Sequence, residues 1–264
     1  MISIDKYAYS SKLRYKDPMQ KLVFTAMTVA VCIWAKNNII SVVVIFMMGG
    51  MTVLRGGIPL RFLLKLLLVP MSFLLVSIFT IAVNISDNKE LLLLAVPVAG
   101  KWIGFSAAGL KDSIRLFLKA LGAVSCLYFL SLNTPMVDLL SALRRLRIPK
   151  ILVELTGLVY RFVFVLLDTV NRIYIAQSSR LGYSSLSSSY RSLGAMGSML
   201  FVKAYKQSDA LYTALEARGY DGELNVLAEN YESHWSWYVS AVAVNALLVL
   251  LAVVMKSATG GPLL

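Results

Sequence analysis

The sequence contains a single histidine and only two cysteines, so it has few of the side chains from which proteins build transition-metal sites. Cys32 and Cys126 lie within apolar runs and lack CxxC spacing, which favours small core hydrophobes over a disulfide or a metal clamp. His234 stands beside Trp235, where a lone histidine is more typical of a membrane boundary than of a ligand or a general base. The eleven methionines are scattered, largely in apolar runs, and indicate core filling. We therefore expect no metal site in this chain.

The sequence also lacks a Gly-x-x-x-x-Gly-Lys-Ser/Thr loop, the backbone cradle with which many proteins bind the phosphates of ATP. Acidic residues are few, with 14 Asp and Glu against 26 Lys and Arg. Asp112 is isolated, and Asp87 and Glu90 lie outside the membrane, so no DxxxD-like cluster supports a membrane enzyme that acts on lipid or isoprenoid substrates. We expect neither catalytic residues nor a cofactor in this chain.

Apolar residues, by contrast, are abundant. Hydrophobic residues make up 58% of the chain and charged residues only 15%, and the mean hydropathy is +0.71. A soluble domain uses roughly 45–50% apolar residues, so the composition indicates a protein embedded in a lipid bilayer. Its net charge of +12 is typical of basic cytoplasmic loops and of contact with anionic lipid headgroups. We therefore expect the basic residues to meet the bilayer surface rather than a nucleic acid.

Several apolar runs approach the length of about 20 residues that a membrane-spanning helix needs. The five predicted spans, of which the first is somewhat short, are Leu22–Ala35, Ile39–Leu54, Phe62–Val83, Leu110–Leu132 and Trp237–Met255. The segment Leu91–Phe105 is also apolar, but prolines and glycines interrupt it, so we expect a short hairpin or a surface segment there. The predicted fold class is all-α: a polytopic membrane protein with about five transmembrane helices plus long cytoplasmic helices.

Lysine and arginine are distributed unevenly over the connections between these runs. The N-terminal arm, the connection that holds Arg55 and the stretch from 144 to 218 are basic, whereas the alternate connections carry few lysines. Basic connections favour the cytoplasmic side, so we expect the N-terminus inside and the C-terminus outside. Lys111, Arg115 and Lys119 recur every fourth residue at the outer end of the fourth span and run against this scheme. The sequence leaves open whether they face protein, a cavity or the outer surface.

The region between the fourth and fifth spans is too long for a loop, and its pattern is helical. A long helix is predicted from Lys150 to about Arg180, followed by a flexible linker over 184–189 and an amphipathic helix from about Tyr190 to Arg218. The predicted domains are therefore a transmembrane region of four spans at 1–132, cytoplasmic coupling helices at 133–234 and a C-terminal transmembrane helix at 235–264.

The two long helices end in similar basic segments, Ser179-Arg180-Leu181-Gly182 and Ala217-Arg218-Gly219. Two ordinary C-caps would explain them, because glycine adopts the left-handed conformation that ends a helix and arginine complements the helix dipole. Two such endings in one chain favour docking into a partner, because a guanidinium presents five donors in a rigid fork. The candidate site residues for this docking are Ser179, Arg180, Gly182, Ala217, Arg218 and Gly219.

With these endings the chain resembles the transmembrane T component of energy-coupling-factor (ECF) transporters, the modular ATP-driven importers of vitamins and transition metals. Ala217-Arg218-Gly219 matches the family motif, whereas the segment at Arg180 departs from it, with serine for alanine and an inserted leucine. The resemblance extends over essentially the whole chain. Asp5-Lys6-Tyr7-Ala8 and the Arg144–Pro149 stretch look most similar to the cobalt-type branch.

The resemblance implies that each arginine tip docks into one of two ABC-type ATPase subunits, and that ATP and Mg²⁺ bind to those subunits. It also implies a substrate-binding membrane component as a further partner, and the cytoplasmic (inner) membrane of a prokaryote as the location. The expected function is to transmit ATPase motion to that component for cobalt uptake, with nickel or a vitamin as the alternative cargo. The permease of a conventional ABC importer would couple through a single cytoplasmic loop, and two arginine tips argue against it.

Overall fold

The computed structural model describes residues 3–35, 37–86, 92–98, 101–221, 231 and 235–259. His234, Asp87 and Glu90, which the sequence analysis weighed as site residues, lie outside the described residues. The chain divides into two compact units, one comprising Leu140–Glu229 and the other comprising Ile2–Leu139 together with Asn230–Leu264. We describe each unit by itself and call the second the membrane unit. The three predicted domains, with their boundaries at 132/133 and 234/235, stay a prediction.

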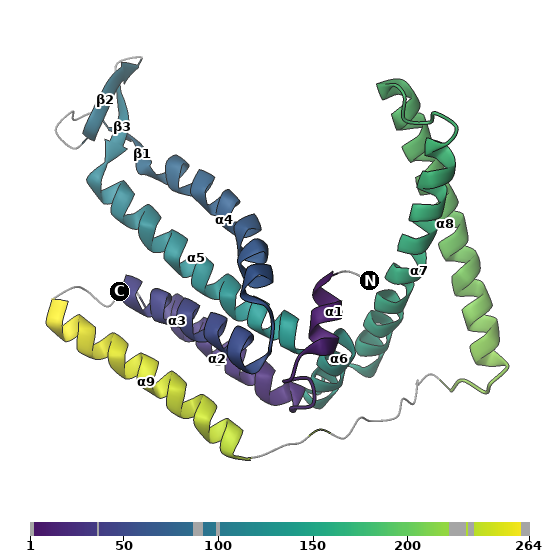
Figure 1. Ribbon diagram of the computed structural model, residues 1–264, viewed down its shortest axis with the longest axis horizontal. Helices are drawn as coiled ribbons and strands as arrows, with labels where there is room; N and C mark the ends of the chain where they lie inside the picture. The colour runs from purple at the N-terminus through teal and green to yellow at the C-terminus, as the bar shows by residue number, and fades with distance from the viewer. Residues whose placement is uncertain are drawn as a thin grey trace. The chain divides into compact units, whose positions relative to one another are not determined.

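The membrane unit is built from apolar helices that coincide with all five predicted spans (Figure 1). Among the described residues, four helical segments are long and apolar enough to cross a bilayer, namely Asn38–Arg55, Leu60–Ala82, Gly109–Asn133 and Trp235–Met255, and the apolar helix Pro18–Trp34 is shorter. The elements of this unit are α1 (Ser3–Ser10), α2 (Pro18–Trp34), α3 (Asn38–Gly50), the π-helix η1 (Met51–Arg55), α4 (Leu60–Ala82), α5 (Ala107–Asn133) and α9 (Trp235–Thr259). The protein is therefore a multi-pass membrane protein whose fold is predominantly α-helical, as predicted.

The first two spans begin where the sequence supplies helix caps. The Asp17 carboxylate accepts from the Met19 amide at 3.0 Å, and Pro18 occupies the first position of α2. The Asn37 side chain accepts from the Ile39 amide at 3.2 Å and begins α3. Such caps satisfy amides that have no partner within the first helical turn, so they fix where α2 and α3 begin.

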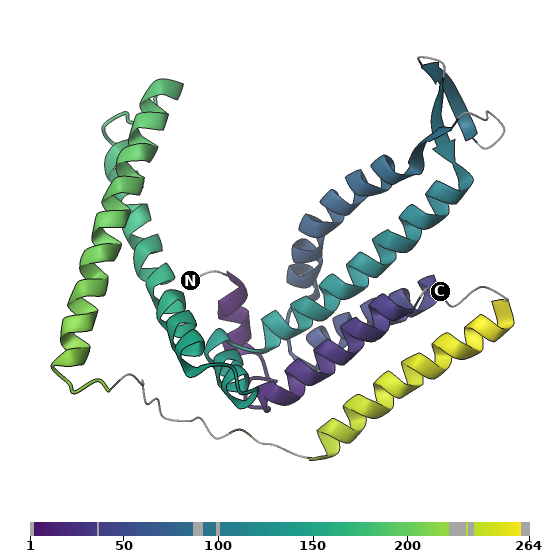
Figure 2. The ribbon, with the colours of Figure 1, turned by 180° about the vertical axis from the view of Figure 1, so that it is seen from behind.

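A small antiparallel sheet connects α4 to α5 (Figures 1 and 2). Its strands are β1 (Val83–Ser86), β2 (Leu92–Val98) and β3 (Lys101–Ser106), in the order β1-β3-β2, with Val83 opposite Phe105 and Val98 opposite Lys101. Strands β2 and β3 are the hairpin expected over 91–105. Because β1 extends α4 and β3 runs into α5, the sheet continues the α4–α5 pair, and it adds a local β element to the all-α prediction.

The core of the membrane unit lies between α2, α3, α5 and α9. Cys32 and Cys126 are fully buried in it, as predicted for small hydrophobes. The rings of Phe24 and Phe129 meet edge to face, with centroids 5.9 Å apart. Gly122 gives α5 its close approach to α2, because a Cβ at this position would lie 2.8 Å from the Cys32 sulfur.

At one end of this unit, polar contacts join the start of α2, the end of α5 and the turn after η1. The Lys21 Nζ donates to the Asn133 carbonyl at 2.9 Å, and the Ser11 hydroxyl donates to the Asn133 side-chain oxygen at 2.7 Å. Gly56 lies against the same Asn133 amide. Arg55 stacks over Trp237 at the start of α9, at 5.9 Å to the ring centroid. The predicted topology places these four chain segments on the cytoplasmic side. The contacts bring them together at one end of the membrane unit.

The three basic residues that ran against the charge scheme have separate local roles. The Lys119 Nζ donates to the Ile33 carbonyl at 2.8 Å, in the last turn of α2, where carbonyls have no intrahelical partner. Arg115 forms a 3.9 Å ion pair with Asp112 one turn away on α5, and Lys111 is exposed. Lys119 therefore ties two spans together through a protein contact, and the three cations do not act as one stripe.

The topology predicts which face of the membrane each of two serines reaches. Ser187 lies in the unit Leu140–Glu229 and Ser257 lies in the last turn of α9. Single cysteines at these positions, in a background with Cys32 and Cys126 replaced, should react with a membrane-impermeant maleimide from opposite faces. We expect labelling at Ser257 in intact cells and at Ser187 only after permeabilisation. Labelling of Ser187 from outside would contradict the topology, and internal labelling of Ser257 would show that the span count is wrong by one.

Candidate functional site: the coupling hairpin

A helical hairpin forms most of the unit Leu140–Glu229, which we call the coupling unit (Figure 1). Its helices are α7 (Lys150–Ser178) and α8 (Leu186–Glu216), and α6 (Met136–Arg145) precedes them. The bounds of α7 agree with the prediction within two residues. The predicted start of α8 at Tyr190 and the flexible linker over 184–189 are wrong, because α8 begins at Leu186.

Hydrogen bonds of serine side chains explain why α8 begins earlier than predicted. The Ser185 hydroxyl caps the helix by accepting from the Ser188 amide at 3.2 Å. The Ser188 and Ser192 hydroxyls, at 2.9 and 2.8 Å, both donate to the Gly182 carbonyl in the turn. A serine-rich run that resembles a linker in composition is thus an N-cap with two hydroxyls that bind the turn before it.

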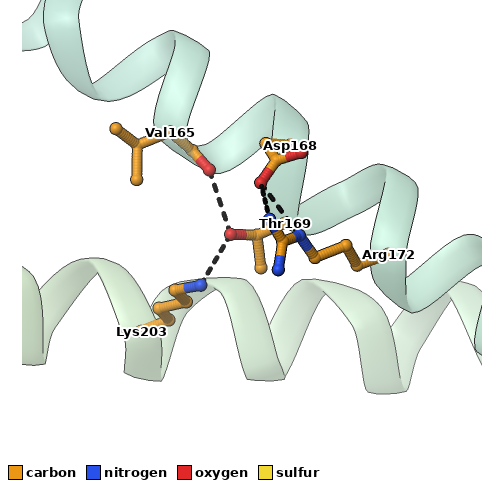
Figure 3. Close-up of polar contacts among 5 residues, drawn as sticks. All are labelled: Val165, Asp168, Thr169, Arg172 and Lys203. Carbon is orange, nitrogen blue, oxygen red and sulfur yellow. Dashed lines mark hydrogen bonds and ion pairs between the residues drawn. The ribbon is translucent and has the colours of Figure 1, made fainter.

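The helices α7 and α8 are also joined midway along their length (Figure 3). The Lys203 Nζ of α8 donates to the Thr169 hydroxyl of α7 at 2.7 Å, and this hydroxyl donates to the Val165 carbonyl at 3.0 Å. Arg172 pairs with Asp168 at 2.9 Å on the same stretch of α7. Lys203 therefore links the two helices through a side-chain hydrogen bond at this level.

The first arginine tip is a Schellman motif at the end of α7. The Gly182 amide donates to the Gln177 carbonyl at 2.9 Å, and the Leu181 amide donates to the Ser178 carbonyl at 3.0 Å. Leu181 takes the left-handed conformation, with φ of 57°, and its side chain is 74% exposed. Glycine ordinarily occupies this position, because a Cβ costs about 1 kcal/mol there.

The second tip, at the end of α8, repeats the same backbone geometry. The Tyr220 amide donates to the Leu215 carbonyl at 3.0 Å, and the Gly219 amide donates to the Glu216 carbonyl at 3.0 Å. Gly219 has φ of 71°. Arg180 and Arg218 therefore occupy the same position in two identical caps, one residue before the left-handed residue.

This equivalence corrects how the two sequence segments correspond. The sequence analysis paired Gly182 with Gly219 and regarded Leu181 as an insertion. In the structure Leu181 stands where Gly219 stands, and Gly182 corresponds to Tyr220. Gly182 is instead needed for space, because a Cβ there would lie 2.8 Å from both the Gln177 carbonyl oxygen and the Ser192 hydroxyl. The first tip therefore departs from the second by substitution and not by length.

Both arginines are presented to the surroundings. Arg180 and Arg218 are exposed, as are the small residues Ser179 and Ala217 that precede them. Among the residues that the structure describes, no carboxylate pairs with either guanidinium. The tips lie at opposite ends of α8, whose 31 residues make it about 46 Å long at 1.5 Å per residue. The hairpin thus carries two exposed arginines in equivalent backbone positions, one near each end of α8.

Glycine at the second cap gives a stability prediction. Gly219→Ala should lower the free energy of unfolding by about 1 kcal/mol, because its φ is left-handed. Gly194→Ala is the matched control: Gly194 is exposed within α8, and a Cβ there meets no heavy atom within 4 Å. It should gain about 1 kcal/mol from helix propensity. Thermal unfolding of the detergent-solubilised chain measures both changes, and equal shifts would contradict the cap assignment.

The hairpin exposes many large apolar side chains between its tips. On α8 they include Tyr190, Met199, Phe201 and Tyr205, which are 61–77% exposed, whereas Met196 is buried. Large apolar side chains gathered on an exposed surface are typical of surfaces that bind proteins or membranes. The coupling unit therefore has the composition of a surface that other subunits cover.

The described residues contain no group of three or more His, Cys, Asp and Glu side chains that could hold a metal ion. The hairpin offers hydrogen-bond donors, charge and apolar surface. What it can do chemically is bind acidic groups or carbonyl oxygens on a partner and carry movement along two coupled helices.

Comparison with known proteins agrees with this architecture. The family model described as cobalt transport protein, CbiQ, matches residues 9–227. The chain is 30% identical to cobalt transport protein CbiQ of Salmonella typhimurium over 227 residues, which are 86% of this chain and 100% of the relative. It is 29% identical to an uncharacterized protein of Methanocaldococcus jannaschii over 257 residues, 97% of this chain and 94% of the relative. It is also 29% identical to the energy-coupling factor transporter transmembrane protein EcfT of Ruminiclostridium cellulolyticum over 231 residues, 84% of each chain. The chain therefore belongs to the cobalt transport protein family represented by CbiQ.

Proposed function

We propose that this chain is the transmembrane coupling component of an ATP-driven importer, and that Arg180 and Arg218 are the points at which two ATPase subunits hold it. The observation that carries the proposal is the identity of the two helix caps. Each fixes an exposed arginine, without a carboxylate partner among the described residues, at the same position of a Schellman motif, and the hairpin sets their spacing. A solvated helix end needs no such duplication.

The mechanism is mechanical coupling. ATP and Mg²⁺ bind to the partner ATPases, and closure of the two ATPases moves the grooves that hold the tips. The rigid caps pass this movement to α7 and α8, and the Lys203–Thr169 contact keeps the helices in register. The helices then act on the membrane spans and on a substrate-binding membrane partner, for which the exposed apolar surface of the hairpin supplies the contact area.

The cargo we propose is cobalt, because the relative that the chain covers in full is a cobalt transport protein. Nickel or a vitamin is the alternative. The chain itself should not capture the cargo, and calorimetry on the purified protein is expected to give no stoichiometric sub-micromolar cobalt or nickel site.

Co-expression with its neighbouring genes, followed by purification through a tag on this chain, tests the assembly. Mass spectrometry should identify ATP-binding subunits and a membrane partner. Uptake of labelled cobalt, nickel and vitamins by cells that carry the complete set then assigns the cargo. A tagged chain that purifies without any ATPase, from cells that transport cobalt through the same gene set, would overturn the proposal.

A further inference from the structure

A groove opens on the membrane unit between α2, the junction of α3 with η1, and the first turns of α9. Its volume is about 440 Å³, which is within the range of small-molecule sites. Nearly all of its lining side chains are apolar, among them Phe46, Met47 and Leu54; the polar exceptions are Arg55 and Ser240. The groove is therefore an apolar trough with a single charged side chain.

The guanidinium of Arg55 lies at a level where lipid headgroups are expected. Arg55 is the last residue of the π-helical turn η1, and its guanidinium lies over the ring of Trp237 at 5.9 Å. Trp237 and the highly exposed Trp235 lie in the first turn of α9, and tryptophan gathers at membrane interfaces. Arg55 is exposed, and within the described part of the chain no carboxylate pairs with it. The side-chain methylene groups of the exposed Lys12 lie 3.6 Å from the Cβ position of Gly57, two residues after Arg55.

A glycine keeps the trough open. Gly50 lines the groove, and a Cβ built on it meets no heavy atom within 4 Å. Its backbone is right-handed helical, with φ of −60° and ψ of −44°, so the conformation does not demand glycine. The missing side chain leaves open space beside Phe46 and Leu54, in a helix where any apolar residue would otherwise fit.

We propose that this groove binds one anionic phospholipid, with an acyl chain along the apolar lining and the phosphate on Arg55. The guanidinium fork matches phosphate oxygens in two parallel hydrogen bonds, and Trp237 packs against the guanidinium face, which leaves the N–H edge for the phosphate. Lys12 adds positive charge at the same end, which favours a lipid with net negative charge over a zwitterionic one. The apolar lining of the trough suits an acyl chain.

Native mass spectrometry of the full-length chain, titrated with phosphatidylglycerol and with phosphatidylcholine, tests the proposal. The wild type should retain one phosphatidylglycerol and prefer it about tenfold, and Arg55→Gln should lose that factor. Lys65→Gln removes an equally exposed cation outside the groove and should leave the preference unchanged. Gly50→Trp should fill the trough and remove both lipids, and inorganic phosphate at millimolar concentration should displace neither.

Two further variants separate loss of binding from loss of folding. Arg55→Lys keeps the charge and should retain the preference in part, and Gly50→Leu should weaken both lipids less than tryptophan does. Size-exclusion profiles check that each variant is monodisperse. Unchanged phosphatidylglycerol retention in both Arg55→Gln and Gly50→Trp would overturn the proposal, as would displacement by phosphate alone. If Gly50→Trp left lipid retention intact but disrupted binding of a membrane partner or a second copy, the occupant would be a protein helix, and the proposal would be wrong.

Discussion

The double variant Arg180→Glu, Arg218→Glu is expected to abolish ATP-dependent cobalt uptake and to release the chain from its ATPases. Each arginine is exposed and pairs with no carboxylate among the described residues, so the proposed function places its partner groups on another subunit. A glutamate at either position would face the partner's acidic group with a like charge, or leave that buried group without its counter-ion. Either outcome costs about 3–5 kcal/mol per site. Uptake of labelled cobalt and co-purification of the ATPases measure the two effects separately.

Arg191→Glu is the matched control for this charge reversal. Arg191 is an exposed arginine in α8 that lies outside both caps, so the charge reversal made at each tip, placed here instead, should leave uptake and assembly close to wild type. The single variants Arg180→Glu and Arg218→Glu compare how much each site contributes to uptake and assembly. Both should be impaired, because both arginines occupy the same cap position. Normal uptake and normal assembly in the double variant would remove the basis of the proposed function.

Gly56→Ala is expected to destabilise the membrane unit more than any other glycine substitution in it. A Cβ at Gly56 would overlap the Asn133 side-chain oxygen and the Thr52 carbonyl. The same Asn133 oxygen accepts from the Ser11 hydroxyl, and the Asn133 carbonyl accepts from Lys21. Overpacking costs about 1–3 kcal/mol and each buried hydrogen bond that breaks costs about 1–3 kcal/mol more, so a loss of about 3–5 kcal/mol is expected.

Gly49→Ala makes the identical chemical change where there is room. A Cβ at Gly49 would lie 3.9 Å from a Leu63 methyl group, which is ordinary contact. Monodisperse yield and thermal unfolding in detergent compare the two variants. Gly56→Ala should lose most of its folded yield and Gly49→Ala should keep it. Equal stability of the two variants would show that the Asn133 contacts do not hold this end of the unit together.

Features that arise from local periodicity were predictable from the sequence. Each of the five apolar runs became a helix within a few residues of its predicted bounds, because an unbroken apolar run of that length has few alternatives in a bilayer. Proline and glycine correctly marked the interruption between α4 and α5. Both ends of α7 were also predictable, because Pro149 fixes its start and a polar segment follows its last turn.

Features that depend on tertiary contact or on backbone dihedral angles were not predictable. Lys119 looked like a misplaced cation until its partner proved to be the Ile33 carbonyl, 86 residues away. Leu181 could not be recognised as the left-handed residue, since leucine rarely adopts that conformation and a glycine stood beside it. The serine-rich composition of 184–189 predicts a flexible linker, whereas hydrogen bonds of Ser185 and Ser188 determine its structure.

Photo-crosslinking from the two tips in living cells tests the central claim most directly. A benzoylphenylalanine at Ser179 or at Ala217 stands next to each arginine on an exposed surface, and a third at Val76, 66% exposed on the membrane helix α4, serves as the control. In cells that import cobalt, both tip positions should form adducts with an ATP-binding protein, and Val76 should form none. Cobalt import through this chain without an ATPase adduct from either tip would contradict the account.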